Sequence, residues 1–210
     1  MTKILVEHYE NCFTKHGDTA KGFDWPNEEG AMKRHQIMSE LVKKTNSSLL
    51  DIGCGSMHFL EFLEKCDHPK QIHYHGLELS DKFAARCKEK YPDVPLYHLD
   101  ILNDQDFEKL PQFDYVTLNG LLTLKAKMSQ MEMTDFYQKI LKRSWSRTRC
   151  GMAFNLMSKD IVDWTREDLF YQSFSEVSAF LKSELGTRHF VFRQDYGLYE
   201  FTTYVYREAQ

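Results

Sequence analysis

The sequence predicts an α/β fold in which a doubly wound, mostly parallel sheet of seven strands is covered by helices on both faces. Two observations carry this prediction. From residue 47 onward, short apolar runs end in polar or glycine-rich turns, and an amphipathic stretch follows each of them, as in strand-helix-strand units. Near the C-terminus, two runs rich in Phe, Tyr, Val and Thr follow one another closely. They can only pair as an antiparallel hairpin, because a parallel return needs about a dozen connecting residues or more.

Residues 1–45 are expected to form a helical cap with a loop at its centre. Apolar residues recur at helical spacing in MTKILVEHYENC and again in EGAMKRHQIMSELVKK. Between these stretches, GDTAKGFDWPNEEG contains three glycines and one proline, which favour a loop. Such a segment can fold over a pocket. Residues 46–210 are expected to form the core, and the two parts together a single domain.

The core elements follow from the alternation of the two patterns. The expected strands before the hairpin are residues 48–52, 72–79, 94–99, 114–118 and 152–156, and the expected helices are residues 59–65, 81–90, 130–146 and 175–185. Right-handed crossovers between successive strands give a parallel sheet with helices on both faces. The hairpin joins HFVFRQDY to LYEFTTYVYR at Gly197, so the mostly parallel sheet ends in one reversed strand.

Composition excludes several classes of protein. The chain is 42% hydrophobic and 28% charged, which suits a packed core and excludes a disordered chain. The net charge of -4 and the lack of a basic run make nucleic acid an unexpected partner. Five scattered cysteines without a Cys-x-x-Cys spacing predict reduced thiols in the cytoplasm. The sequence shows neither an apolar signal peptide nor a stretch long enough to cross a bilayer, so no membrane association is expected.

Three neighbouring strands each end in a residue suited to a nucleoside. In LLDIGCGSMHFLEFL, a strand ends at Asp51 and a turn with Gly53 and Gly55 lets the backbone pass close to a ligand before a helix begins. Glu78 ends the second strand, where a carboxylate can accept hydrogen bonds from both ribose hydroxyls. Asp100 ends the third strand beside an apolar isoleucine, a pair that suits the amine and the flat face of adenine. The three positions together are more specific than any one of them.

This combination resembles the class I S-adenosylmethionine-dependent methyltransferases, from about residue 45 to residue 206. The resemblance implies a Rossmann-like fold, S-adenosylmethionine as cofactor and S-adenosylhomocysteine as product. It also implies that the glycine loop passes the methionine part of the cofactor, and that the end of the fourth strand faces the transferred methyl group. The cofactor-binding residues it implies are Asp51, Gly53, Cys54, Gly55, Glu78, Leu79, Asp100, Ile101, Asn119 and Gly120.

The chain departs from the pattern of that family at two places. Many members have a third glycine where this chain has Met57, so the loop or the start of the next helix is expected to differ. The fourth strand ends in TLNGLL and lacks the box of Asn or Asp, two prolines and an aromatic residue that members use for exocyclic amines of bases and for glutamine amides. This argues against methylation of a nucleobase amine.

Acceptor-side residues can only be nominated from the sequence, and no catalytic residue is assigned. The candidates are Trp25, Arg34, His35, Asn119 and Tyr196, with His35, His58 or Asp195 as a base for a hydroxyl acceptor. Each has a structural alternative: Trp25 as a loop aromatic packed on the core, Arg34 on a solvated face, and Tyr196 in a cross-strand pair. His73, His75 and His98 lack a carboxylate at ligand spacing, so no metal is expected.

The function that the resemblance implies is methyl transfer from S-adenosylmethionine to a small polar metabolite or biosynthetic intermediate, by in-line attack on the sulfonium methyl. A catalytically silent domain that binds S-adenosylmethionine or S-adenosylhomocysteine is the first alternative. A protein methyltransferase is another. A nicotinamide-dependent oxidoreductase is disfavoured, because its Gly-x-Gly-x-x-Gly fingerprint would need a glycine at position 58.

Overall fold

The structure, a computed structural model, describes residues 2–66 and 70–210. The N-terminal segment contains α1 (Thr2–His16), the short 3-10 helix η1 (Ala20–Phe23) and α2 (Glu28–Ser39). The next five strands along the chain are β1 (Ser47–Ile52), β2 (Ile72–Glu78), β3 (Leu96–His98), β4 (Phe113–Leu118) and β5 (Thr148–Ser158). The helices between them are α3 (His58–Lys65), α4 (Asp81–Lys90), α5 (Asp104–Phe107) and α6 (Gln130–Ser146). The chain ends with β6 (Tyr171–Gln172), α7 (Phe174–Ser183), β7 (Phe190–Arg193) and β8 (Glu200–Tyr206).

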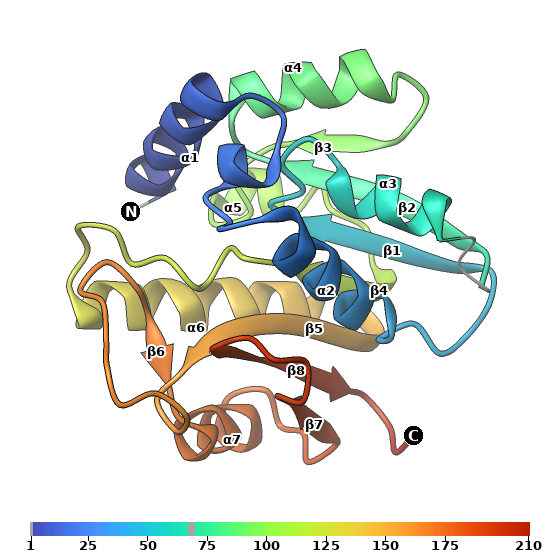
Figure 1. The fold of residues 1–210 in the computed structure, drawn as a ribbon. Coiled ribbons are helices and arrows are strands. Elements are labelled where there is room, and N and C mark those ends of the chain that lie inside the picture. The colour runs from blue at the N-terminus through green and yellow to red at the C-terminus, as the bar shows by residue number, and fades with distance from the viewer. Residues whose placement is uncertain (1, 67–69) are drawn as a thin grey trace.

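The strands form one sheet in the order β3-β2-β1-β4-β5-β8-β7 (Figure 1). β8 runs antiparallel to both of its neighbours, whereas the pairs from β3 to β5 are parallel. The expected mostly parallel sheet with one reversed strand is therefore confirmed. An eighth strand, the two-residue β6, pairs with the end of β5 outside this path; it is too short to give a sequence pattern.

Alternating residues of the strands face opposite sides of the sheet and build two hydrophobic clusters. Leu50 and Val116 pack in the cluster that contains the apolar faces of α6 and α7. Leu49 and Tyr115, one position earlier on the same strands, pack with residues of α2 and α3. This period of two explains why both faces of the sheet are covered and why the strands read as continuous apolar runs.

Several boundaries differ from those expected. The hairpin connection is wider than a tight turn at Gly197, because β7 ends at Arg193 and β8 begins at Glu200. Within this connection, Arg193 pairs with Asp195, and the Tyr196 hydroxyl lies 3.0 Å from Thr202 Oγ1. These side-chain contacts hold the wider loop against the hairpin. β5 is longer than expected, since its pairing with β8 continues at both ends.

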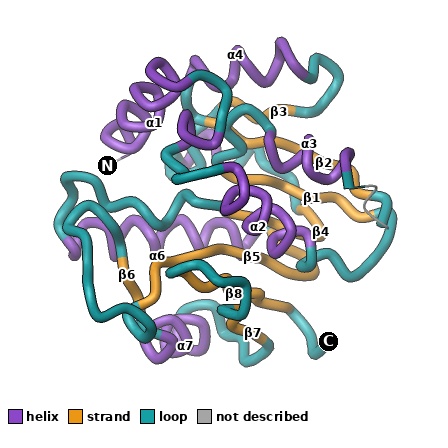
Figure 2. The backbone as a smooth tube through the Cα atoms, in the orientation of Figure 1, coloured by secondary structure: helices purple, strands orange, loops and turns teal. Residues whose placement is uncertain are grey.

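The carboxyl ends of the parallel strands lie on the side of the sheet where α1 lies (Figure 2). Their loops and the N-terminal segment line one cleft there. Sheet topology thus gathers residues that are far apart in the sequence at one edge, as is usual for ligand sites in open α/β sheets.

Candidate active site

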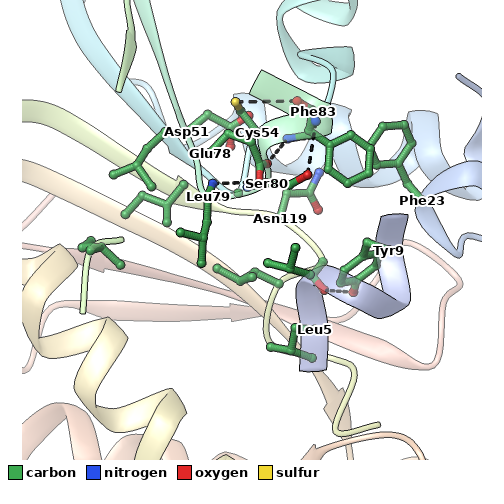
Figure 3. A pocket seen from close by; sticks show the side chains of 18 of the residues that line it. Leu5, Tyr9, Phe23, Asp51, Cys54, Glu78, Leu79, Ser80, Phe83 and Asn119 are labelled. Carbon is green, nitrogen blue, oxygen red and sulfur yellow. Dashed lines mark hydrogen bonds between the residues drawn. The ribbon is translucent and has the colours of Figure 1, made fainter. Parts of the chain in front are cut away.

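The cleft at the strand ends contains every residue expected to contact a cofactor. All ten line it, together with side chains from α1, η1 and the loop after η1. Figure 3 shows this site, with Asp51, Glu78 and Asn119 at the strand ends and Leu5 and Tyr9 approaching from α1. Strands β1 and β2 and the loops after β3 and β4 each contribute to the lining, so the strand order brings the expected positions together.

The glycine loop after β1 is held close to β2 by its backbone. The N–H groups of Gly53 and Cys54 both donate to the carbonyl of Leu77, at 2.8 and 3.1 Å. Gly53 and Gly55 have φ values of 71° and 55°, which glycine adopts at little cost. Met57, which occupies the position of the family's third glycine, also takes the left-handed conformation, at φ 63°. Its side chain is fully buried, so packing offsets the strain, and α3 begins one residue later.

Glu78 is the most strongly hydrogen-bonded acid of the cleft. Its carboxylate accepts backbone N–H groups of Gly55 at 2.9 Å, Leu79 at 2.8 Å and Ser80 at 2.9 Å. Burial nevertheless raises the pKa of Glu78 to about 7, because the three N–H donors only partly offset the loss of solvation. Three of its roughly four acceptor positions are occupied, so the carboxylate keeps one for a ligand hydroxyl, and a second hydroxyl would share an occupied oxygen.

Asp51 and Asp100 have different environments. The Asp51 carboxylate is buried and accepts the hydroxyls of Tyr74 at 2.7 Å and Thr117 at 2.9 Å. Burial raises its pKa to about 6 in spite of these bonds. The Asp100 carboxylate is half-buried and accepts the N–H of Leu102 at 2.8 Å. It thereby fixes the turn that places Ile101 against the cleft.

Asn119 carries the clearest sign of a missing partner. Its side-chain nitrogen and oxygen are both buried and have no hydrogen-bond partner among the residues that the structure describes. The neighbouring Gly120 is fully engaged: its N–H donates to Asn155 Oδ1 at 2.7 Å, and its carbonyl accepts the Tyr9 hydroxyl at 3.3 Å. Since the backbone around Asn119 is fixed, its amide is left to face the cleft.

The side of the cleft that the sequence predicts to face the acceptor is aromatic. Trp25 and His35 both line it, and their rings meet edge to face at 5.4 Å. His35 is 4% exposed, and its Nδ1 has no partner in the described parts of the chain. Burial and the cations His58 and Arg34 lower the pKa of His35 to about 3, so its imidazole is neutral near pH 7. His58 also lines the cleft, and burial lowers its pKa although it pairs with Asp18 at 2.7 Å.

Three acceptor-side candidates lie outside the cleft. Arg34 forms a bidentate pair with the buried Glu200, with Nε 3.0 Å and Nη2 2.9 Å from its carboxylate oxygens. Tyr196 lies in the connection between β7 and β8, with its hydroxyl against Thr202 of β8, so it forms a contact with this strand and not the expected cross-strand pair. Asp195 pairs with Arg193 on the far side of the hairpin. Their sequence neighbours suggested exposure to a ligand, but tertiary packing gives each of them a partner elsewhere.

Arg34 is connected to the cleft by a chain of buried hydrogen bonds through Glu200 and Asn155, here called the relay, which the sequence did not reveal. Glu200 accepts Arg34 on one side and Asn155 Nδ2 at 3.0 Å on the other, and Asn155 Oδ1 accepts Gly120 N–H. The Arg34 guanidinium also lies 5.5 Å from the Trp25 ring. Asn155 interrupts the apolar run MAFNL, which was the available signal, since a polar residue in a buried strand needs partners.

The three histidines considered for a metal do not come together. His73 contacts Asn46 at 2.7 Å, and His98 contacts Asp81 at 3.3 Å. His75 stacks against Tyr97. Each therefore has an ordinary surface role. Within the described ranges, no helix is both long enough and apolar enough to cross a membrane.

The strand order with its single reversed strand, and a cleft at the strand ends, define a Rossmann-like domain of the methyltransferase type. Residues 50–142 match a family described as "Methyltransferase domain". This match, which covers less than half of the chain, and the fold agree with the predicted resemblance to the class I S-adenosylmethionine-dependent methyltransferases.

Solved structures of low sequence identity share this fold. CalS10 from Micromonospora echinaspora, an amino pentose methyltransferase involved in calicheamicin biosynthesis, is 16% identical with a TM-score of 0.58, covering 96% of this chain and 97% of that chain. Magnesium protoporphyrin IX methyltransferase (ChlM) from Synechocystis PCC 6803 is 12% identical with a TM-score of 0.54, covering 86% and 81%. DesVI from Streptomyces venezuelae is 15% identical with a TM-score of 0.57, covering 85% and 92%. No curated protein gives a significant sequence match.

Proposed function

We propose that this enzyme methylates a small polar acceptor, a metabolite or a biosynthetic intermediate, which binds between the end of β4 and the N-terminal cap. The observation that carries the proposal is the Asn119 amide, which lines the cleft with both polar atoms buried and without a partner in the described chain. An unsatisfied buried polar group costs about 1 to 3 kcal/mol. A polar ligand at this position would remove that cost.

The residues of the cleft fit the cofactor. Glu78 would accept the ribose hydroxyls, Asp100 the adenine amine, and Ile101 would pack on the adenine ring. The left-handed conformations of Gly53 and Gly55 let the backbone approach the methionine part closely. The orphaned amide of Asn119 is the independent sign that a ligand completes this cleft.

Catalysis would depend mainly on orientation. The bound cofactor supplies an activated sulfonium methyl group. Asn119 would hold the acceptor for in-line attack, and such positioning can lower a barrier by about 7 to 11 kcal/mol. Tyr9 and Trp25, which both line the cleft from the cap, would exclude water.

His35 is better suited to orient the acceptor than to take its proton. With a pKa lowered to about 3, its imidazole is neutral but binds a proton weakly, and a general base works best with a pKa near the working pH. Its unpartnered Nδ1 can accept or donate a hydrogen bond. An acceptor that is already nucleophilic would need no general base.

The cap supports a small acceptor. Thr2, Leu5, Val6 and Tyr9 of α1 line the same cleft as the strand ends, so α1 forms one of its walls. An acceptor that reaches the methyl group would have to fit between this wall and Asn119. A long polymer would need the cap to be displaced.

Binding of S-adenosylhomocysteine by the full chain tests the cofactor part of the proposal. We expect one equivalent to bind by calorimetry and to raise the melting temperature. Glu78→Ala should weaken binding by about tenfold or more, because it removes hydrogen bonds to the ribose worth about 1.4 kcal/mol. Gln36→Ala, at an exposed position of α2, should bind normally. No binding at millimolar ligand would end the proposal.

The acceptor is identified with methyl-labelled S-adenosylmethionine and a cell extract. We expect label in a small polar product, whose mass defines the acceptor and the methylated atom. Label that appears only in protein would contradict the small-molecule part. Binding without any turnover would favour the silent domain.

A further inference from the structure

A cluster of potential metal ligands lies on the cap, outside the cleft lining. His8 Nε2 is 2.8 Å from Asp24 Oδ2, and Cys12 Sγ is 3.7 Å from the same His8 nitrogen. One ligand atom of each of the three residues lies within 4.8 Å of the others. The methyl-transfer proposal uses none of these side chains.

Backbone structure, rather than chance proximity of flexible side chains, places the three residues together. His8 and Cys12 are four residues apart on α1, and therefore share one face of the helix. Asp24 follows η1 in the left-handed conformation at φ 59°, where its N–H bonds to the carbonyls of Ala20 and Lys21. The cluster thus joins α1 to the turn that precedes α2.

The ligand set and the distances suit zinc. Zn²⁺ accepts imidazole nitrogen, thiolate sulfur and carboxylate oxygen. With Zn–N near 2.0 Å and Zn–S near 2.3 Å, tetrahedral ligand atoms lie roughly 3.3 to 3.6 Å apart. The His8–Asp24 and Cys12–His8 separations of 2.8 and 3.7 Å need adjustments of only about half an ångström. Side chains of His8 and Asp24 are 33% and 42% exposed, so water can reach a fourth position.

We propose that His8 Nε2, Cys12 Sγ and an Asp24 carboxylate oxygen bind one Zn²⁺ ion, with water as the fourth ligand. The Cys12 thiol releases its proton to solvent when the Zn–S bond forms. The thiolate and the carboxylate then balance the two positive charges of the ion. Without metal, His8 Nε2 contacts both the Asp24 carboxylate and Cys12 Sγ, and a part-exposed pair of this kind typically contributes only about 0 to 1 kcal/mol.

A metal at this cluster would also order the cleft. His8 directly precedes Tyr9, whose hydroxyl donates to the Gly120 carbonyl, and Asp24 directly precedes Trp25. Trp25 packs so closely that a Cβ on Gly120 would lie 3.1 Å from its Nε1. Fastening α1 to the turn therefore holds two side chains on the backbone next to Asn119. We expect zinc to tighten binding of S-adenosylhomocysteine several-fold.

Cobalt substitution tests the site without any cofactor. The full chain, freed of metal with a chelator, is titrated with Co²⁺. We expect a thiolate-to-cobalt charge-transfer band that saturates at one equivalent and disappears when Zn²⁺ is added. Cys12→Ser should remove the band, and Cys66→Ser, which removes an exposed thiol, should keep it. A folded chain that gives no band, or a band that survives Cys12→Ser, would overturn the proposal.

Zinc affinity, measured against a chromophoric chelator, examines the other two ligands. His8→Gln and Asp24→Asn should each weaken binding tenfold or more, and asparagine tolerates the left-handed backbone at position 24. His16→Gln, at the end of the same helix, is the matched control and should bind zinc normally. Equal zinc affinity in all three variants would contradict the assignment. Because neither measurement uses S-adenosylhomocysteine, failure of the proposed methyl transfer would leave both results interpretable.

Discussion

Glu78 shows how one residue combines opposing electrostatic effects. Burial raises its pKa to about 7, above the 4.5 of an unperturbed glutamate, although three backbone N–H groups favour the charged form. An acid whose folded pKa is raised destabilises the fold as it ionises. The stability of the free protein should therefore fall through this group between about pH 4.5 and 7. A ribose that donates two hydrogen bonds favours the ionised form, so a ligand would work against the effect of burial.

The affinity for S-adenosylhomocysteine should accordingly rise with pH. Below the pKa of about 7, ligand binding must first remove a proton from Glu78, so affinity should increase up to tenfold per pH unit and level off above pH 8. Calorimetry between pH 5.5 and 8.5 measures this. Glu78→Gln should bind more weakly, and the step near pH 7 should be absent. A wild-type profile that is flat, or that falls with pH, would contradict the role given to Glu78.

Gly55 allows a second test at the level of one residue. A Cβ at this position would lie 2.4 Å from the Phe23 ring, and φ is +55°. Gly197 has a φ of +75° with nothing within 4 Å of its added Cβ. Alanine should therefore cost about 1 to 2 kcal/mol of unfolding free energy at Gly197, and about 1 to 3 kcal/mol more at Gly55 because of the overlap with Phe23.

Urea unfolding of the two alanine variants separates conformational strain from steric overlap. Phe23→Ala in the Gly55→Ala background should recover part of the extra loss, because the overlapping ring is removed. Equal losses at Gly55 and Gly197 would show that the cap does not press on the glycine loop.

At the scale of elements, the reversed strand β8 connects the cap to the cleft. Glu200 of β8 is 2% exposed and is paired with Arg34 of α2 and with Asn155 of β5. Asn155 in turn holds the Gly120 N–H. A buried acid on the C-terminal strand therefore fixes both the position of α2 and the backbone at the end of β4.

Glu200→Gln should cost about 3 to 5 kcal/mol of unfolding free energy, since it leaves the Arg34 guanidinium buried without its counter-charge. At temperatures where the variant remains folded, S-adenosylhomocysteine should bind several-fold more weakly, because Asn155 no longer has a fixed partner. Glu184→Gln is the control: it breaks the exposed pair with Lys142 and should change stability by less than about 1 kcal/mol. Similar unfolding curves for the two variants would refute the relay.

The N-termini of two helices follow a capping pattern that is visible in the sequence. Ser129 and Ser173 form capping boxes with Glu132 and Glu176 at the starts of α6 and α7. α3 lacks a side-chain cap, because Met57 enters it in the left-handed conformation. The departure from the glycine pattern thus alters the start of this helix, as expected, while the loop still lines the cleft.

At the scale of the whole molecule, the cap and the strand ends enclose the site together. Residues of α1 and the turn after η1 line the cleft together with the end of β2 and the loop after β4. The affinity for a ligand should therefore depend on how firmly the cap is held, and ligand binding should stabilise the cap.

Hydrogen exchange measures this coupling. S-adenosylhomocysteine should slow exchange of amides in residues 2–25 by a larger factor than in α7, which contributes no residue to the cleft. Added zinc should further slow amide exchange around His8 and Asp24. The Cys12→Ser variant should lose this zinc-dependent slowing and keep the slowing caused by S-adenosylhomocysteine. Uniform protection of cap and α7 would argue against closure by the cap.

The sequence by itself predicted a mostly parallel sheet, its reversed strand and the residues that line the cleft at the strand ends. Each of these predictions depends on local patterns: apolar periodicity, glycine turns, and acids that end consecutive strands. Parallel strands necessarily gather their carboxyl ends at one edge, so Asp51, Glu78 and Asp100 could be brought together without coordinates. Only the tertiary structure decided the partners of side chains from distant segments. Arg34 meets Glu200 across 166 positions of sequence, and Cys12 meets Asp24 through the fold of the cap, because such contacts depend on how helices pack and leave no periodic signal in the chain.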